Sequence, residues 1–346
     1  MTWRVLFRTE SGAMIGAGHL VRCLALAQQF ARQGATVAFV CRSRPGALLD
    51  LPREAGFALH VLPETLDEAA DAAATGSFAR QWQANLAVVD HYRLAAPWEI
   101  AVREATGRLL AIDDLADRAH ACDWLLDQND NRPQAQRYSR WVPAACRLLL
   151  GPRFALLRPE FQAARHTCEP RDGQLRRVLV FFSGSDDDNE TAKALRGLAL
   201  LGPRAWRVDV VIGTSHPDAA GIGELCCQHG WHLHQQIDYM ADLLAQADVC
   251  LGSAGTASWE RCALGVPALV VELADNQKEV IAALAQRGCV KVLGPARLVR
   301  PHDYAQALLS LQPGEVAAMS RAAWDWVDGR GAERVARDVL ETMSES

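Results

Sequence analysis

One histidine lies where its side chain could act on a bound ligand. His19 follows the glycines Gly16 and Gly18 and stands three residues before Arg22. Glycines without a Cβ let backbone N–H groups approach an anion or a sugar, and a helix N-terminus adds a partial positive charge. An imidazole in the first helical turn tends to stay neutral because the helix dipole disfavours imidazolium. A neutral imidazole can take a proton from water, so this turn predicts a ligand site with His19 as general base.

A Gly-x-Gly turn after a first strand also occurs in dinucleotide-binding folds. Here the run from Gly16 to Val21 lacks the third glycine of that fingerprint. The second apolar run ends in Cys41 and Arg42, where a ribose-binding carboxylate would be expected. The sequence therefore disfavours a nicotinamide site, and we expect neither an organic cofactor nor a metal.

Two apolar runs of the N-terminal half end in ionisable residues. The residues that follow are Asp90, His91 and Tyr92 after one run, and Asp113 and Asp114 after the next. Open α/β sheets bind ligands beyond the carboxyl ends of their strands. Each aspartate alone could be a helix cap or part of a loop ion pair. Two such clusters together with His19 favour a polar pocket.

A second pattern lies in the C-terminal half. The apolar run Val249–Leu251 leads into the loop Gly252-Ser253-Ala254-Gly255-Thr256, which opens a helix. Amides and hydroxyls in such a loop form a phosphate-binding arrangement. Glu260 lies about 6 Å of helical rise beyond Thr256, which suits a carboxylate that accepts hydrogen bonds from ribose hydroxyls. The alternative is a Gly/Ser loop that only caps an ordinary helix.

Short apolar runs alternate with helix-length segments along the chain, which predicts βαβ units and parallel sheets. The strands expected in the N-terminal half are Trp3–Phe7, Thr36–Val40, Ala58–Leu62, Leu86–Asp90, Leu109–Ile112, Trp124–Asp127 and Leu148–Leu150. Those expected in the C-terminal half are Arg177–Phe182, Val208–Ile212, His232–Gln235, Val249–Leu251, Ala268–Val271 and Val290–Leu293. The acidic, alanine-rich segment Glu64–Ala74 is expected to form a solvated helix and no site.

Between the two halves the apolar period fails, and Pro, Arg and Gly accumulate. We therefore expect an N-terminal Rossmann-like domain over residues 1–158, a linker over 159–174 and a C-terminal Rossmann-like domain over 175–346. The last helix of the chain is a candidate to pack back on the N-terminal domain.

Composition excludes several classes of protein. The chain has 346 residues, of which half are hydrophobic and 22% charged, and this is ordinary for a globular protein with two cores. The net charge of -5 and the lack of basic runs interleaved with aromatics argue against a nucleic-acid partner. The ten cysteines show no zinc spacing and are typical of a reducing compartment. No apolar stretch reaches the roughly 20 residues of a membrane span, so we expect a cytoplasmic protein, acting as a monomer.

These ordered motifs resemble a known family. The strand, the glycine loop, Glu260, Gly265-x-Pro267, an apolar strand and Asp275-Asn276-Gln277 resemble the donor-nucleotide domain of GT-B glycosyltransferases, notably the N-acetylglucosaminyltransferase of peptidoglycan synthesis. The N-terminal half resembles the UDP-sugar hydrolases of pseudaminic acid biosynthesis, which cleave UDP-2,4-diacetamido-2,4,6-trideoxy-β-L-altropyranose. The residues that carry this likeness are Gly16-x-Gly18-His19-x-x-Arg22, Asp90-His91-Tyr92, Asp113-Asp114 and Leu150-Gly151-Pro152-x-Phe154-Ala155-Leu156-Leu157-Arg158.

The resemblance implies an α/β fold of two Rossmann-like domains that face a cleft (GT-B), and a metal-independent, inverting UDP-sugar hydrolase with His19 as catalytic base. Together with the patterns above, it gives a sugar site of Arg8, Gly16, Gly18, Arg22, Asp90, Tyr92, Asp113, Asn276 and Gln277. The expected UDP site comprises Gly184, Ser185, Ser253, Gly255, Thr256 and Glu260. The chain has Ser183-Gly184-Ser185-Asp186 where Gly-Gly-Ser-Asp is more usual in the family.

Three alternatives remain open. A UDP-sugar glycosyltransferase of this fold would use His19 to activate an acceptor hydroxyl, and fold alone does not separate it from a hydrolase. A non-catalytic nucleotide-sugar binding module would not need His19. The run Asp186-Asp187-Asp188 could hold Mg²⁺, although three carboxylates on a turn more often form a solvated, helix-capping run.

Overall fold

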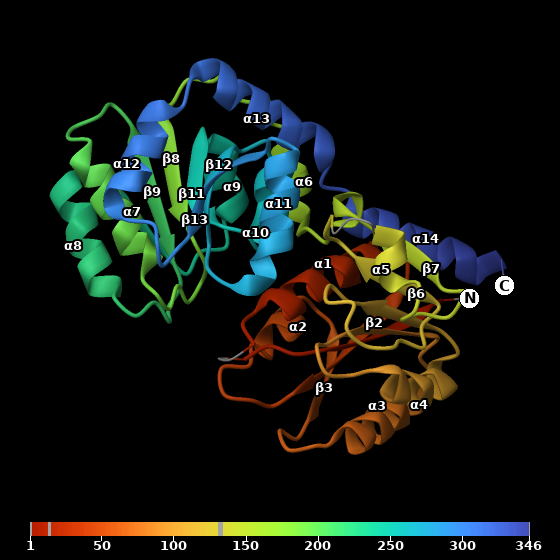
Figure 1. The fold of residues 1–346 in the computed structure, drawn as a ribbon. Coiled ribbons are helices and arrows are strands. Elements are labelled where there is room, and N and C mark those ends of the chain that lie inside the picture. Colours follow the sequence, from red (N-terminus) through yellow and green to blue (C-terminus); the bar gives the residue numbers. More distant parts are fainter. Residues whose placement is uncertain (1, 13–14, 131–133, 346) are drawn as a thin grey trace. The chain divides into compact units, whose positions relative to one another are not determined.

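The computed structural model describes residues 2–12, 15–130 and 134–345, and it divides into two compact units (Figure 1). Unit 1 comprises Met1–Pro159 and Arg330–Ser346, and unit 2 comprises Glu160–Gly329. Nearly all of the segment expected as a linker lies in unit 2, and it contains the helix α6 (Pro159–Arg165). The last helix of the chain lies in unit 1.

Unit 1 contains a seven-stranded parallel sheet with the strand order β3-β2-β1-β4-β5-β6-β7. The bounds are β1 Arg4–Thr9, β2 Thr36–Arg42, β3 Ala58–Leu62, β4 Leu86–Asp90, β5 Leu109–Ile112, β6 Trp124–Asp127 and β7 Arg147–Leu150. All seven strands expected from the apolar runs are present. The order reverses between β1 and β4, so the crevice at their carboxyl ends is the topological switch point of this sheet.

Unit 2 repeats this architecture with a six-stranded parallel sheet in the order β10-β9-β8-β11-β12-β13. The bounds are β8 Arg177–Phe181, β9 Arg207–Ile212, β10 His232–Gln235, β11 Val249–Ser253, β12 Ala268–Glu272 and β13 Val290–Pro295. Its switch point lies between β8 and β11. The two α/β sheets confirm the expected fold class.

Helices connect the strands within each unit. In unit 1 they are α1 Gly18–Arg32, α2 Asp50–Glu54, α3 Glu68–Trp82, α4 Ala96–Thr106, α5 Gln134–Tyr138, the 3-10 turn η1 Pro152–Phe154 and α14 Gly331–Glu345. In unit 2 they are α7 Glu190–Leu200, α8 Ala219–His229, α9 Met240–Gln246, α10 Ala257–Ala263, η2 Asp275–Gln277, α11 Lys278–Gln286, α12 Pro301–Ser310 and α13 Pro313–Trp326.

Helix α1 is fixed from two sides, and this holds the turn that carries His19. Its apolar face, including Leu26 and Phe30, is completely buried in the same core as Phe7 of β1. Helix α14 also packs against α1, with Val335 and Val339 buried in that core (Figure 1). Burial of apolar side chains at about 25 cal/mol per Å² stabilises this arrangement. The first turn of α1 therefore starts from a rigid support.

Candidate active site

His19 pairs with the carboxylate at the end of β4. Its Nδ1 lies 2.6 Å from Oδ1 of Asp90, and Asp90 is completely buried. The two residues meet because β1 and β4 are neighbours at the switch point, so the helix after β1 starts beside the last residue of β4. Burial alone would raise the pKa of Asp90, but the Arg22 guanidinium and His19 outweigh it and hold the pKa well below its usual range.

This contact assigns the tautomer of His19. An ionised carboxylate only accepts hydrogen bonds, so Nδ1–H of His19 is the donor and the lone pair of the neutral ring lies on Nε2. Within the described residues, no side chain or backbone group hydrogen-bonds to that Nε2. The His19 side chain is only 8% exposed, so few water molecules can reach the ring. The arrangement is that of a base whose orientation is set by a buried acceptor.

Arg22 and Tyr92 complete the surroundings of His19. Arg22 donates through Nε to Asp90 Oδ2 at 2.6 Å and through Nη1 to Asp114 Oδ2 at 3.0 Å. The Tyr92 ring meets the imidazole edge-on, with 4.5 Å between centroids, and its side chain is exposed. Partial burial and the nearby Asp114 carboxylate raise the pKa of Tyr92 to about 12, so its hydroxyl remains a donor at neutral pH.

Gly16 and Gly18 lie in the turn before this histidine. Gly16 has φ +77°, a left-handed conformation that favours glycine, and its N–H donates to the Gly12 carbonyl at 2.8 Å. Both Gly16 and Gly18 are exposed. Ala17 supplies no capping side chain to α1. Ala13 and Met14, in the same stretch of sequence, lie outside the described residues.

The structure places Arg8 inside a buried ion network. Its Nη2 lies 2.7 Å from Asp71 Oδ2 and 2.7 Å from Glu10 Oε1, its Nε donates to Asp71, and its Nη1 donates to the Thr9 carbonyl. Arg8 is only 1% exposed. All three of its nitrogens are therefore engaged within the fold, and the guanidinium holds the loop after β1.

Asp71 corrects the expectation that the acidic segment Glu64–Ala74, in which it lies, is solvated. The helix begins at Glu68, and Asp71 is completely buried rather than solvated. It accepts hydrogen bonds from Arg8, from Arg42 Nε at 2.9 Å and from Trp98 Nε1 at 2.8 Å. The alanine-rich sequence gives no clear apolar stripe, so nothing local marks the face on which Asp71 lies. Its buried partners come from three separate elements that only the tertiary fold brings together.

Like Arg8, Asp113 is occupied by contacts within the fold. Its Oδ1 lies 2.7 Å from Arg118 Nη1, and its Oδ2 accepts from the Ala116 N–H at 2.8 Å. Burial would raise its pKa, but the His120 contact and the Arg118 charge lower the pKa of Asp113 to about 2. Nearby, burial raises the pKa of Asp127 to about 7.

In unit 2, the loop after β8 is organised by Asp186. Its carboxylate accepts from the N–H groups of Glu190 at 3.1 Å and Thr191 at 2.8 Å, so it caps α7. Asp186 itself is buried, whereas the following Asp187 and Asp188 are exposed. The expected helix-capping role is confirmed for Asp186, but its side chain is buried rather than solvated.

The nearby positions Gly184 and Ser185 lie at the same edge of the sheet. Gly184 is exposed, and a Cβ at Gly213 would lie 2.2 Å from its carbonyl oxygen. Only a glycine at position 213 therefore lets the two loops approach so closely. Ser185 is partly exposed.

The loop after β11 presents backbone donors. Gly255 is exposed, and the N–H groups of Gly255 and Thr256 find no acceptor among residues 2–12, 15–130 and 134–345. The Ser253 hydroxyl is engaged elsewhere, because it donates to the Phe182 carbonyl at 2.6 Å. Glu260 lies one turn along α10 and is partly exposed. The loop therefore offers backbone amides to a ligand, but not the Ser253 hydroxyl that the sequence predicted beside them.

Asn276 and Gln277 lie in the 3-10 turn η2 at the end of β12. Asn276 is exposed, while Gln277 uses its Oε1 to accept from the Leu273 N–H at 3.1 Å. Gln277 thus stabilises its own turn, and Asn276 is the freer of the two for a ligand.

Arg261 is a residue that the sequence analysis missed. It lies in α10, is only 2% exposed and donates to the Ser253 carbonyl at 2.6 Å. Its position directly after Glu260 in the sequence was the available signal, but an arginine beside a glutamate reads as an ordinary exposed helical residue.

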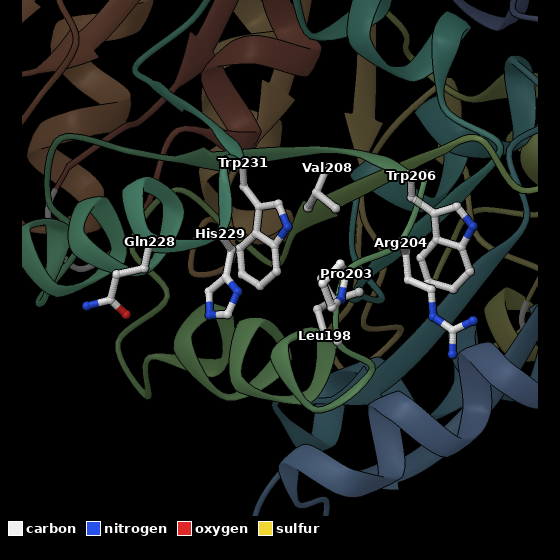
Figure 2. Close-up of a pocket in the computed structure, with 10 residues that line it drawn as sticks. Leu198, Pro203, Arg204, Trp206, Val208, Gln228, His229 and Trp231 are labelled. Carbon is white, nitrogen blue, oxygen red and sulfur yellow. The ribbon is translucent and has the colours of Figure 1, made fainter.

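A separate pocket of about 470 Å³ lies at the opposite edge of the unit 2 sheet, where α7 and α8 end and β9 begins (Figure 2). In Figure 2, Trp206 and Trp231 stand on opposite sides of Val208. His229 stacks on Trp231 with 4.6 Å between centroids, and the Arg204 guanidinium lies 5.7 Å from the Trp206 centroid. Side chains of the protein already lie against both aromatic rings, so we assign no ligand to this pocket.

The described residues also bear on metal sites and on membrane spans. Across residues 2–12, 15–130 and 134–345, no group of three or more His, Cys, Asp or Glu side chains is arranged to hold a metal ion. Over the same residues, no helix has the length and apolar character that crossing a bilayer requires.

The fold places the chain in the GT-B class. The crystal structure of MurG from Acinetobacter baumannii is similar with a TM-score of 0.70 and 15% identity, and the match covers 99% of this chain and 100% of that one. The UDP-GlcNAc 2-epimerase of Neisseria meningitidis, solved bound to UDP-GlcNAc, matches with a TM-score of 0.68 and 12% identity over 99% of this chain and 100% of that one. At such identities these likenesses show the fold alone, and they confirm the expected GT-B architecture.

Sequence comparison points to a narrower likeness. The UDP-2,4-diacetamido-2,4,6-trideoxy-beta-L-altropyranose hydrolase of Campylobacter jejuni is 26% identical over 290 residues, which span 82% of this chain and 97% of that protein. The spore coat polysaccharide biosynthesis protein SpsG of Bacillus subtilis is 25% identical over 199 residues, or 56% of this chain and 58% of that protein. No protein-family model matches the chain. The resemblance to the hydrolase is confirmed.

Proposed function

We propose that the protein is an enzyme that hydrolyses a UDP-linked sugar to UDP and the free sugar. The sugar we propose is 2,4-diacetamido-2,4,6-trideoxy-β-L-altropyranose, a precursor in nonulosonic (pseudaminic) acid biosynthesis, because the Campylobacter jejuni hydrolase named for that substrate is similar over 82% of this chain. The observation that carries the proposal is the 2.6 Å contact between His19 Nδ1 and Asp90 Oδ1.

In this mechanism His19 is the general base. Nε2 takes a proton from water as the water oxygen attacks the anomeric carbon, and the bond between that carbon and the UDP oxygen breaks. The bonding electron pair leaves with UDP, and the proton stays on the imidazole until solvent removes it. Asp90 keeps Nδ1–H oriented and stabilises the imidazolium that forms. A single displacement by water inverts the anomeric centre, as in inverting glycosidases.

The leaving group needs electrostatic stabilisation more than a strong acid, because UDP is a good leaving group. We propose that the N–H groups of Gly255 and Thr256 donate to the diphosphate, with Gly184 and Ser185 beside it. Glu260 then accepts from the ribose hydroxyls. Among the described residues no metal-binding cluster competes with this role, and we propose that turnover needs no metal.

In unit 1, the contacts we propose for the sugar are Gly16, Gly18 and Tyr92. In unit 2, the exposed Asn276 is the residue we propose for a sugar contact. Tyr92 contributes a protonated hydroxyl beside the base. Arg8, Arg22, Asp113 and Gln277 are already bound within the fold. We therefore propose that these four residues hold the surrounding loops in place, while Asp90 orients His19.

The test is UDP release from a panel of UDP-linked amino sugars by purified protein, with no acceptor present and with EDTA in a parallel series. The proposal expects release that is fastest for the 2,4-diacetamido-2,4,6-trideoxy sugar and is unaffected by EDTA. Release that appears only when an acceptor is added would identify a glycosyltransferase instead. Binding of the UDP-sugar, with no turnover overnight at stoichiometric protein, would identify a binding module.

A further inference from the structure

Arg261 carries a buried positive charge that no side chain balances. Its Nη2 donates to the Ser253 carbonyl at 2.6 Å and to Ser258 Oγ at 3.0 Å, while its Nη1 is buried with no hydrogen-bond partner. Of the carboxylates that the structure describes, none forms an ion pair with it. The residue is only 2% exposed, so bulk water does not solvate the guanidinium either.

Among the residues that the structure describes, the other buried arginines do not share this state, and Arg42 pairs with Glu10 and Asp71. Arg8 and Arg22 each pair with two carboxylates. Arg171 has no such partner, yet each of its three nitrogens donates to a backbone carbonyl. A buried charge without a compensating partner is strongly destabilising. Within the described part of the chain, Arg261 is therefore the buried arginine that has no carboxylate partner and a nitrogen without a hydrogen bond.

The position of Arg261 links it to the loop after β11. Ser253, whose carbonyl it holds, is the last residue before the loop 254–256. At the preceding residue, a Cβ on Gly252 would lie 3.2 Å from Arg261 Nη1 and 2.5 Å from the Phe181 carbonyl oxygen. The guanidinium thus lies directly behind the segment whose Gly255 and Thr256 N–H groups lack acceptors in the described part of the chain.

We propose that Arg261 is a positioning residue for the diphosphate of a nucleoside diphosphate, and that the bound phosphates supply the missing negative charge. The inference rests on the UDP site proposed above and adds the group that makes this site selective for diphosphates. Arg261 acts from behind the loop. It fixes the Ser253 carbonyl, so the two amides keep one orientation, and its charge attracts the phosphates through a medium of low dielectric constant.

Helix α10 has only 7 residues, so its dipole is small and this role depends on the charge of Arg261 instead. If the charge of Arg261 acts on the phosphates, its contribution must grow with the number of phosphates on the ligand. A residue that merely supported the loop would affect uridine, UMP and UDP alike.

The experiment measures the affinities of uridine, UMP, UDP and inorganic pyrophosphate by calorimetry for the full chain and for Arg261→Met and Arg261→Lys. For Arg261→Met we expect UDP and pyrophosphate affinity to fall roughly 10- to 150-fold, the size of a charge–charge attraction over roughly 5–11 Å at an effective dielectric constant of about 20. Uridine affinity should stay within about twofold, because only the phosphates sense the charge. The exposed Arg321 in α13 provides the control variant Arg321→Met, which should bind all four probes as the natural chain does.

Arg261→Lys keeps the positive charge but replaces the planar guanidinium by an ammonium group. Its UDP affinity should therefore lie between the affinity of the natural chain and that of Arg261→Met. Its uridine affinity should be unchanged. If Arg261→Met does not fold, this lysine variant decides the matter by the same ratio of UDP to uridine affinity. Equal losses for uridine and UDP, or unchanged UDP affinity in a folded variant, would overturn the inference.

Failure of the proposed function has a different signature. If the natural chain binds UDP and pyrophosphate through Arg261 but releases no UDP from any UDP-sugar, the hydrolase proposal fails and the diphosphate site stands. If it hydrolyses the sugar nucleotide while Arg261→Met binds UDP normally, the diphosphate role fails alone.

Discussion

The two switch points of the molecule are built in opposite ways. At the β1/β4 switch of unit 1, every buried charge described near His19 has a side-chain partner of the other sign, as Arg22 has in Asp90 and Asp114. At the β8/β11 switch of unit 2, the described donors are two backbone N–H groups and a guanidinium with no carboxylate. The same sheet topology therefore supports one site whose buried charges are paired and one with a buried guanidinium that has no carboxylate partner among the described residues.

This difference suits two different tasks. A general base must keep its ring oriented toward the water that it deprotonates, so its neighbours have to be fixed. A complete ion network fixes them because each partner restrains the next. A site for a diphosphate benefits from donors that have no partner before the ligand arrives, since no internal bond has to be broken on binding. The predictions below separate these two kinds of construction.

The largest effect is expected when the base itself is removed. His19→Asn should lower turnover by about 100- to 10,000-fold, the range for loss of a general base, and should leave UDP affinity nearly unchanged. Steady-state kinetics and calorimetry with UDP measure the two quantities. The exposed His229 provides a matched control, since His229→Asn should keep full activity. If His19→Asn retained more than half of the activity, the assignment of the base would be wrong.

Removing the central carboxylate of unit 1 should weaken the fold as well as the chemistry. Asp90→Asn leaves the buried Arg22 with one charged partner and His19 without its negatively charged acceptor, so we expect a loss of about 3–5 kcal/mol in the free energy of unfolding. Urea titration measures it. Asp50→Asn serves as the control, because the Asp50 and Arg53 side chains are 83% and 53% exposed and their ion pair should contribute little. Equal stability of both variants would contradict a rigid, charge-balanced site.

In unit 2, loss of a single ligand contact should affect binding and not stability. Glu260→Ala should weaken UDP binding by roughly 1.5–3 kcal/mol, the range for hydrogen bonds to a charged group. Calorimetry with UDP decides this, and Glu224→Ala on the exposed surface of α8 is the control. A dissociation constant that does not change would remove Glu260 from the nucleotide site.

The smallest effect concerns a protonated carboxyl in unit 1. Burial raises the pKa of Asp127 to about 7, whereas a carboxyl in an unfolded chain titrates near pH ~3.9. The folded state therefore binds more protons between these values, so the stability contributed by Asp127 is present below about pH 4 and is lost as pH rises through about 7.

Asp127→Asn removes this titration, so its stability should fall less than that of the natural chain between pH 5 and pH 8. A tenfold change in the proton affinity of a carboxyl corresponds to about 1.4 kcal/mol, so the difference should amount to a few kcal/mol at most. Urea midpoints at the two pH values measure the change. Parallel slopes in both proteins would show that Asp127 is ionised throughout.

Much of the fold follows from local pattern. Parallel strands buried on both faces give short apolar runs, which is why Leu86–Asp90, Leu109–Ile112 and Trp124–Asp127 match β4, β5 and β6 at both ends. The carboxyl ends of strands could be identified for the same reason, and this brought His19 and Asp90 under consideration before their contact was known.

The rest depends on tertiary contacts that leave no local signal. Asp71 is buried because β1, β2 and α4 converge on it with Arg8, Arg42 and Trp98. The Ser253 hydroxyl faces a backbone carbonyl of the neighbouring β8 loop instead of solvent. Which partner each polar side chain takes is decided by the packing of distant segments, so a sequence pattern identifies the residue type and not its role.

The most direct test of the account is turnover of the UDP-sugar in water enriched in ¹⁸O. If His19 activates water against the anomeric carbon, the label must appear in the anomeric hydroxyl of the released sugar and UDP must stay unlabelled. NMR before mutarotation should show the inverted configuration. Label in the β-phosphate of UDP would mean attack at phosphorus, and the role assigned here to His19 would then be wrong.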